Sequence, residues 1–69
     1  MITENRIIKI IVELSGNGEQ INYYVDTIKG RESYTEKNIP VSIVRIMNHE
    51  KPIYHEKQFS GKELFVYRP

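Results

Sequence analysis

The residues best suited to chemistry stand in one short stretch, in which the tripeptide His-Glu-Lys occurs at 49–51 and again at 55–57. If a turn centres near Pro52, His49 and His55 become cross-strand neighbours, with Glu56 beside one of them. Two imidazoles and a carboxylate can bind zinc, but the spacing matches no established zinc motif. The charged turn of a β-hairpin that protects a sheet edge from aggregation explains the same residues. We therefore expect no metal and no other cofactor.

Residues suited to acid–base or nucleophilic catalysis have simpler explanations elsewhere. Asp26 is the only aspartate, and its expected cross-strand pairing with Lys9 explains it. Gly16 and Gly18 belong to a turn, so they do not form a phosphate-binding loop. Three of the four serines fall in expected turns or loops and none in a nucleophile elbow; they are Ser15, Ser33, Ser42 and Ser60. The sequence therefore predicts a protein that is not an enzyme.

Length and charge narrow the class of protein further. The 69 residues are enough for one small domain, residues 1–69, and the absence of cysteine excludes disulfide bonds. No apolar run is long enough to span a bilayer, and residues 1–6 lack the order of a secretory signal, so a cytoplasmic location is expected. Ten basic and nine acidic side chains give a net charge of +1. Proteins that bind nucleic acid usually carry a stronger basic signature.

The apolar residues are those of a β protein, and the first half of the chain predicts a hairpin. Eleven Ile and five Val stand against two Leu and no Ala, and β-branched side chains favour sheets. Residues 6–14 also fit one face of a helix, but Asn17-Gly18 follows, and Asn-Gly is the strongest short hairpin signal. A two-residue turn there pairs residues whose numbers sum to 35.

This register sorts the hairpin into two faces. One face is almost wholly apolar, with the pairs Leu14–Ile21, Val12–Tyr23, Ile10–Val25 and Ile8–Thr27. The other face has the pairs Glu13–Asn22, Ile11–Tyr24, Lys9–Asp26 and Ile7–Ile28. A slip of one residue would spoil both faces.

The second half of the chain predicts three more strands, at 41–48, 53–59 and 63–68. Ser33-Tyr34-Thr35-Glu36 matches a capping box, which allows one helical turn near 33–38 before Pro40. The last hairpin fits either a two-residue loop or a bulged three-residue loop. Five antiparallel strands in this order suggest an all-β barrel or sandwich with an SH3-like or OB-like layout.

The second face of the first hairpin carries the leading functional hypothesis. A solvated sheet face should be mostly polar, yet Ile7, Ile11, Tyr24 and Ile28 interrupt this one. A chain this short has little material to cover a second face. We therefore expect a protein-binding module, such as an adaptor, a subunit or a small inhibitor, whose partner is another protein or a second copy in a homodimer.

The alternative hypothesis is a small barrel that binds nucleic acid through its last three strands. Residues 40–69 carry a net charge of +2, and aromatic and basic side chains alternate there. The candidate residues for stacking bases and contacting phosphates are Tyr54, Lys57, Lys62, Tyr67 and Arg68. Oligonucleotide binding that weakens steeply with salt would favour this alternative.

Overall fold

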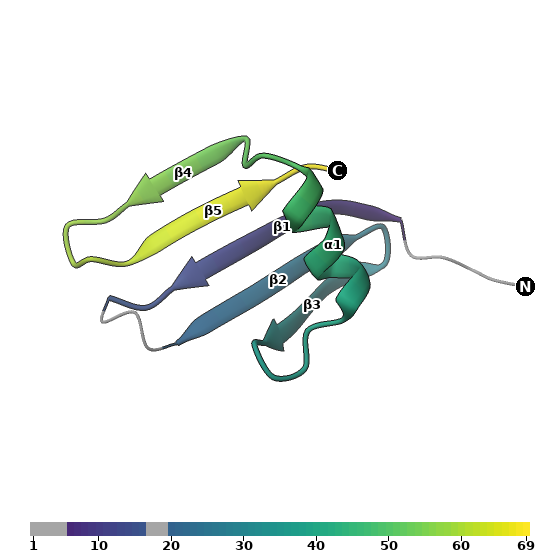
Figure 1. Cartoon of the computed structure of the whole chain (residues 1–69), viewed down its shortest axis with the longest axis horizontal. Coiled ribbons are helices and arrows are strands. Elements are labelled where there is room, and N and C mark those ends of the chain that lie inside the picture. The colour runs from purple at the N-terminus through teal and green to yellow at the C-terminus, as the bar shows by residue number, and fades with distance from the viewer. Residues whose placement is uncertain (1–5, 17–19) are drawn as a thin grey trace, which may run out of the picture.

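One open antiparallel sheet and one short helix make up the described part of the chain, residues 6–16 and 20–69, in the computed structural model (Figure 1). The strand order is β3-β2-β1-β5-β4. The elements are β1 (Ile7–Leu14), β2 (Ile21–Thr27), β3 (Gly30–Thr35), α1 (Val41–His49), β4 (Tyr54–Lys57) and β5 (Glu63–Tyr67). The prediction of a mostly β domain with five antiparallel strands is confirmed. The predicted barrel or sandwich is wrong, because all five strands belong to one sheet and its edge strands β3 and β4 do not pair with each other.

The register predicted for the first hairpin is confirmed over most of its length. β1 and β2 pair from Lys9–Asp26 to Leu14–Ile21, with residue numbers that sum to 35. The Asn17-Gly18 turn lies outside the described residues. Near the start of β1 the register shifts by one residue, so that Ile7 pairs with Thr27. The predicted pairs Ile8–Thr27 and Ile7–Ile28 are therefore wrong, because a bulge at Ile8 inserts one extra residue into β1.

The helical turn predicted near 33–38 is shorter than expected: a third strand continues to Thr35, and residues 36–38 form a turn in which the Ile39 N–H donates to the Thr35 carbonyl at 3.1 Å. β3 follows β2 after the two residues Ile28 and Lys29. The Thr27 hydroxyl helps to hold this connection, since it donates to the Gly30 carbonyl at 3.1 Å and accepts from the Lys29 N–H at 3.1 Å. The capping-box match is wrong because Ser33 lies inside β3, where it pairs with Tyr24, and does not begin a helix.

Residues 41–49 form the helix α1, so the strand predicted at 41–48 is wrong. Pro40 stands at the N-terminal boundary of α1 with φ −64° and ψ 145°, and proline is favoured at helix starts because its missing N–H is not needed there. Ile43, Ile46 and Met47 are spaced by three and four residues and lie on one helical face. All three pack on the core, which outweighs the weak helix propensity of β-branched side chains.

The core lies between α1 and the face of the sheet that α1 crosses (Figure 1). Its buried members among the described residues are Ile10, Val12, Val25 and Ile43, of which Ile10 has no exposed surface. Partly buried side chains surround them, including Tyr23 on β2. Because these residues come from β1, β2 and α1, one small cluster joins the middle of the sheet to the helix.

The last hairpin has the bulged three-residue loop, one of the two alternatives left open by the sequence. The Gln58 N–H donates to the Lys62 carbonyl at 2.7 Å, and the Gly61 N–H donates to the Gln58 carbonyl at 2.9 Å. Gly61 has a φ of 98°, the left-handed conformation required by this bulge. The predicted strand 53–59 therefore ends at Lys57, and Phe59 is fully exposed in the turn.

Two glycines let this turn approach the end of β1. A Cβ added to Gly16 would lie 2.9 Å from the Ser60 carbonyl oxygen, and one added to Gly61 would lie 3.0 Å from the Gly16 carbonyl oxygen. Both contacts are with backbone, which cannot move aside as a flexible side chain can. The close approach therefore depends on the absence of side chains at both positions.

We predict that Gly61→Ala destabilises the fold by more than Gly30→Ala. Both residues have positive φ, which costs an L-residue about 1–2 kcal/mol. Only Gly61 adds a steric clash, since nothing lies within 4 Å of a Cβ at Gly30. Urea denaturation should show the larger loss for Gly61→Ala. Equal losses would mean that the approach to Gly16 does not constrain the fold.

We also predict that Ile43→Ala lowers the free energy of unfolding by about 2–4 kcal/mol, the usual cost of truncating a buried isoleucine. Val41 is on the same helix but 67% exposed, so Val41→Ala is the matched control and should change stability by less than about 0.5 kcal/mol. Urea denaturation followed by circular dichroism gives both values. Similar effects of the two substitutions would contradict the packing of α1 through Ile43.

Candidate functional site

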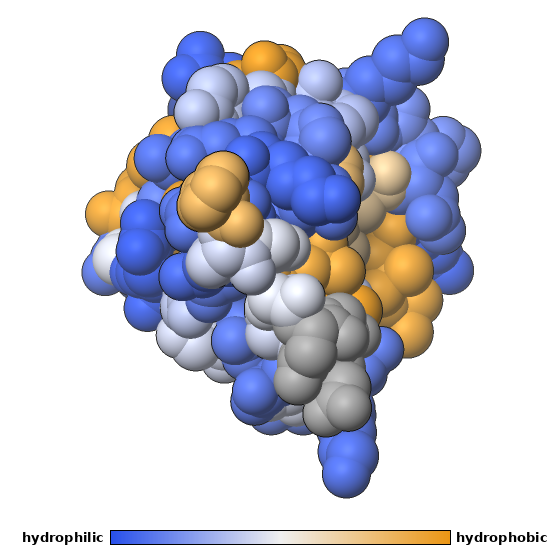
Figure 2. All heavy atoms as spheres, turned by 90° about the vertical axis from the view of Figure 1, so that its left-hand side faces the viewer, coloured by the Kyte–Doolittle hydropathy of each residue, from blue (hydrophilic) through white to orange (hydrophobic). Residues whose placement is uncertain are grey.

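The face of the sheet opposite α1, here called the open face, has no element packed on it in the described part of the chain. Side chains alternate between the two faces along each strand. The core side chains of β1 and β2 point to α1, so their neighbours, such as Ile11 and Tyr24, belong to the open face. Figure 2 looks onto one end of the molecule and shows apolar surface on both sides of that end.

Four apolar or aromatic side chains form a row across the middle of the open face. Ile11 on the central strand pairs with Tyr24 on β2 and with Val66 on β5, and Val66 pairs with Tyr54 on β4. These residues, Tyr24, Ile11, Val66 and Tyr54, are called the apolar row. Three of them are half-buried by their neighbours, whereas Tyr54 is 51% exposed at the edge. Leu64 extends the apolar surface beside Val66.

A carboxylate on one side of the apolar row is paired within the face. Glu13 binds the Lys62 ammonium at 2.8 Å and accepts a hydrogen bond from the Tyr24 hydroxyl at 3.2 Å. The hydrogen bond from Lys62 is the main reason that the pKa of Glu13 lies below its usual value. The same contact raises the pKa of Lys62. Tyr24 is thereby fixed beside Ile11 with its hydroxyl satisfied.

A second charged group lies on the other side of the apolar row. Arg31 on β3 donates two hydrogen bonds to Asp26, at 2.6 and 3.1 Å, and Lys9 lies 3.7 Å from the same carboxylate. The arginine contact is the largest cause of the lowered pKa of Asp26. The Arg31 guanidinium also lies 5.6 Å from the centre of the Tyr24 ring, a favourable cation–π distance. The predicted cross-strand contact of Lys9 with Asp26 is confirmed.

The structure brings together two of the four residues predicted for partner binding. Ile11 and Tyr24 are neighbours in the apolar row. Ile7 instead packs against the core on the α1 side, because the bulge reverses its direction. Ile28 lies in the turn after β2 and is 64% exposed. Val66 and Tyr54 were not predicted as neighbours of Ile11, since no local signal in the sequence shows that β5 pairs with β1.

The residues predicted for nucleic-acid binding are divided between surfaces. Tyr54 lies on the open face, whereas Tyr67 packs against the core on the α1 side. Lys57 lies on the α1 side of β4, because side chains alternate between the two faces along the strand. Lys62 is paired with Glu13. Arg68 is exposed just beyond β5. The two tyrosines therefore do not form one stacking platform.

The two histidines do not face each other across a hairpin. His49 ends α1 and His55 lies on β4, so the suggested cross-strand pair is wrong. The His55 ring stacks on Phe65, with ring centres 4.3 Å apart, and its Nε2 lies 2.8 Å from a Glu63 carboxylate oxygen. Residues 6–16 and 20–69 hold no cluster of three or more potential metal-binding side chains.

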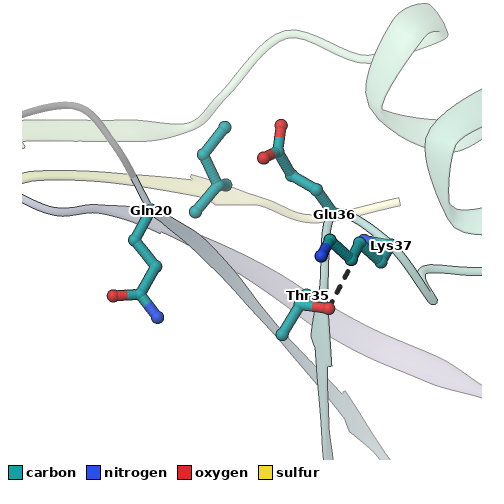
Figure 3. A pocket seen from close by; sticks show the side chains of 5 residues that line it. Gln20, Thr35, Glu36 and Lys37 are labelled. Carbon is teal, nitrogen blue, oxygen red and sulfur yellow. Dashed lines mark hydrogen bonds between the residues drawn. The ribbon is translucent and has the colours of Figure 1, made fainter.

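A shallow pocket of about 280 Å³ lies at one end of the sheet, lined by Gln20, Ile21, Thr35, Glu36 and Lys37 (Figure 3). The Thr35 hydroxyl accepts a hydrogen bond from the Lys37 N–H at 3.3 Å. The Gln20 amide lies on the other side of the pocket from Glu36 and Lys37 (Figure 3). Because most of its lining residues are exposed, the pocket gives a small ligand little burial.

No protein-family model, curated protein or solved structure matches this chain. Within the described residues, no helix has the length and apolar character needed to cross a bilayer. We take the open face, with its apolar row and its internally paired charges, as the candidate functional site.

We predict that Lys62→Met raises the pKa of Glu13 toward its usual value, with little effect on Asp26, which depends on Arg31. A carboxyl group whose pKa is lowered by folding stabilises the protein fully above its unfolded pKa and loses that contribution as pH falls through its folded pKa. Wild-type stability should therefore decline below about pH 4, and the decline should be smaller in Lys62→Met. NMR titration of the side-chain carboxyls and denaturation between pH 2 and 7 would measure both effects. Lys57→Met is the matched control; an unchanged Glu13 pKa in Lys62→Met would contradict the pairing.

Proposed function

We propose that this chain is a non-enzymatic protein-binding module that acts through its open face, as an adaptor, a subunit or a small inhibitor of a larger protein. The apolar row carries this proposal. Solvated sheet faces are mostly polar, yet Tyr24, Ile11, Val66 and Tyr54 lie in register across four strands. Burial of this row against a partner would remove apolar area from water, the main driving force of association.

The charges around the apolar row favour a protein partner over a polyanion. Three cationic groups on this face, Lys9, Arg31 and Lys62, stand close to the carboxylates Asp26 and Glu13. Glu56 adds a third carboxylate, which accepts a hydrogen bond from Tyr54 at 2.9 Å. The charges of these six groups cancel. Phosphate backbones are bound by an excess of Lys and Arg, which the open face lacks.

Tyrosine suits such a surface because it combines a large apolar ring with a hydroxyl that can stay hydrogen-bonded. Tyr24 is held in place by Glu13 and Arg31. A side chain that is already ordered loses less entropy when a partner binds. The network around the apolar row therefore prepares it for docking.

Site-specific photo-crosslinking tests the proposal. A benzophenone amino acid is placed at position 54, on the open face, in one variant. In the control variant it replaces Val41, which is exposed on α1. In lysate of the source cells, we expect the Tyr54 position to give a discrete protein adduct and the Val41 position to give none. Excess wild-type chain should suppress the adduct. Ile11→Asp, shown to be folded by circular dichroism, should compete at least tenfold less well.

Two outcomes would contradict the proposal. Equal adducts from both positions would show that the open face has no special role. Crosslinks to nucleic acid, with oligonucleotide binding that weakens steeply with salt, would favour the alternative based on Tyr54, Lys57 and Arg68.

A further inference from the structure

We propose that the protein covering the open face is a second copy of the same chain, related by a two-fold axis that lies between the two sheets and runs perpendicular to their strands. This inference rests on the proposed function and names its partner. It follows from the way charges are placed on either side of the apolar row.

The open face has three rows of side chains, spaced about 7 Å apart because every second residue of a strand faces the same way. The middle one is the apolar row. Glu13 lies on one side of it, in line with Asn22 and Leu64. Lys9 lies on the other side, in line with Asp26 and Arg31. On the central strand, a negative and a positive group are therefore equally far from Ile11.

A two-fold axis that lies between the two sheets and runs along the apolar row, perpendicular to the strands, exchanges the two outer rows. Each copy then places Lys9 opposite Glu13 of the second copy, on both sides of the axis. Asp26 meets Asn22 of the second copy, whose amide can donate a hydrogen bond to a carboxylate. The strands of the two sheets run nearly parallel or antiparallel to each other, which suits the aligned packing of β-sandwiches.

A two-fold axis parallel to the strands gives the opposite result. It would place Lys9 over Lys9 of the second copy and Glu13 over Glu13 of the second copy. Like charges brought together at an interface are repulsive and select against that arrangement. Charge complementarity therefore singles out the perpendicular axis.

The edges of the sheet are less suited to association between copies than the open face. β4 has only four residues, and β3 carries the charged pair Arg31 and Glu32. Short and charged edge strands protect against edge-to-edge pairing. The chain has a net charge of only +1, so two copies repel each other weakly as they approach.

The size of the face predicts a weak dimer. Five strands about 4.8 Å apart and three rows about 7 Å apart cover roughly 500 Å² in each copy. The total of roughly 1,000 Å² falls below the 1,200 Å² at which stable interfaces begin. We therefore expect association at tens to hundreds of micromolar chain and dissociation on dilution.

Sedimentation equilibrium of the full chain tests the inference. The wild-type mass should rise from 8.2 kDa toward twice that value as concentration increases to about 1 mM. Lys9→Glu and Glu13→Lys should each weaken the dimer at least tenfold, because each places like charges across the axis. The double variant should recover it, since the exchanged charges are again opposite across the axis. In the double variant, the new acidic side chain at position 9 lies near Asp26, and the new basic side chain at position 13 lies near Lys62. Both contacts within one copy are then repulsive, so recovery cannot come from them.

An equimolar mixture of the two single variants is the companion measurement, and it decides the result if circular dichroism shows that the double variant is unfolded. The mixture should form a heterodimer, because each chain then meets opposite charges. A folded double variant that stays monomeric would overturn the perpendicular axis. A monomeric mixture would likewise overturn the perpendicular axis, and a wild-type chain at 8.2 kDa throughout would overturn the dimer. Adducts from the Tyr54 position with a different protein would then still support the proposed function.

Discussion

The burial of Ile43 against Ile10 and Val25 is the interaction on which the rest of the structure depends. A nine-residue helix is marginal in isolation, and α1 has no side-chain hydrogen bond at its N-cap residue Pro40. Packing on the sheet must therefore hold it in place. Because α1 carries the chain from the edge strand β3 toward the opposite edge strand β4 (Figure 1), this small contact also determines where the last hairpin joins β1.

One helix can cover only one face of an open sheet, and the open face reflects this limit. Its polar side chains stabilise one another over short distances, as Glu13 does with Lys62 and Asp26 does with Arg31. Exposed ion pairs of this kind contribute little to stability. Their larger effect is to order the surface around Ile11 and Tyr24. A single helix over one face of the sheet thus accounts for both the small core and the uncovered apolar row.

The sequence predicted those features that depend on local signals. The pairing of Ile11 with Tyr24 followed from the Asn-Gly turn and from alternation along two adjacent strands. The contact of β1 with β5 joins residues 49 to 57 positions apart, and no local pattern gives its register. This is why Ile11 and Tyr24 could be predicted as neighbours, whereas Val66 and Tyr54 could not be added to them.

Composition and spacing point to different structures at residues 41–48, and the strand predicted there followed from composition. β-branched residues dominate 41–48, but Ile39, Ile43, Ile46 and Met47 repeat at helical intervals after the boundary at Pro40. The bulge at Ile8 left no such signal, since Ile7 and Ile8 are chemically identical and either could have faced the core. Its effect on Ile7 became visible only in the paired strands.

The position of β5 between β1 and β4 has a consequence for how the chain is made on the ribosome. β5, which pairs with both β1 and β4, follows the other four described strands in the chain. Until residues 63–67 leave the exit tunnel, the backbone groups of β1 on that side have no strand to bind, and an unpaired strand edge invites association with other chains. A nascent chain of this fold is therefore most exposed to mispairing while its first hairpin is complete and β5 has not yet joined the sheet.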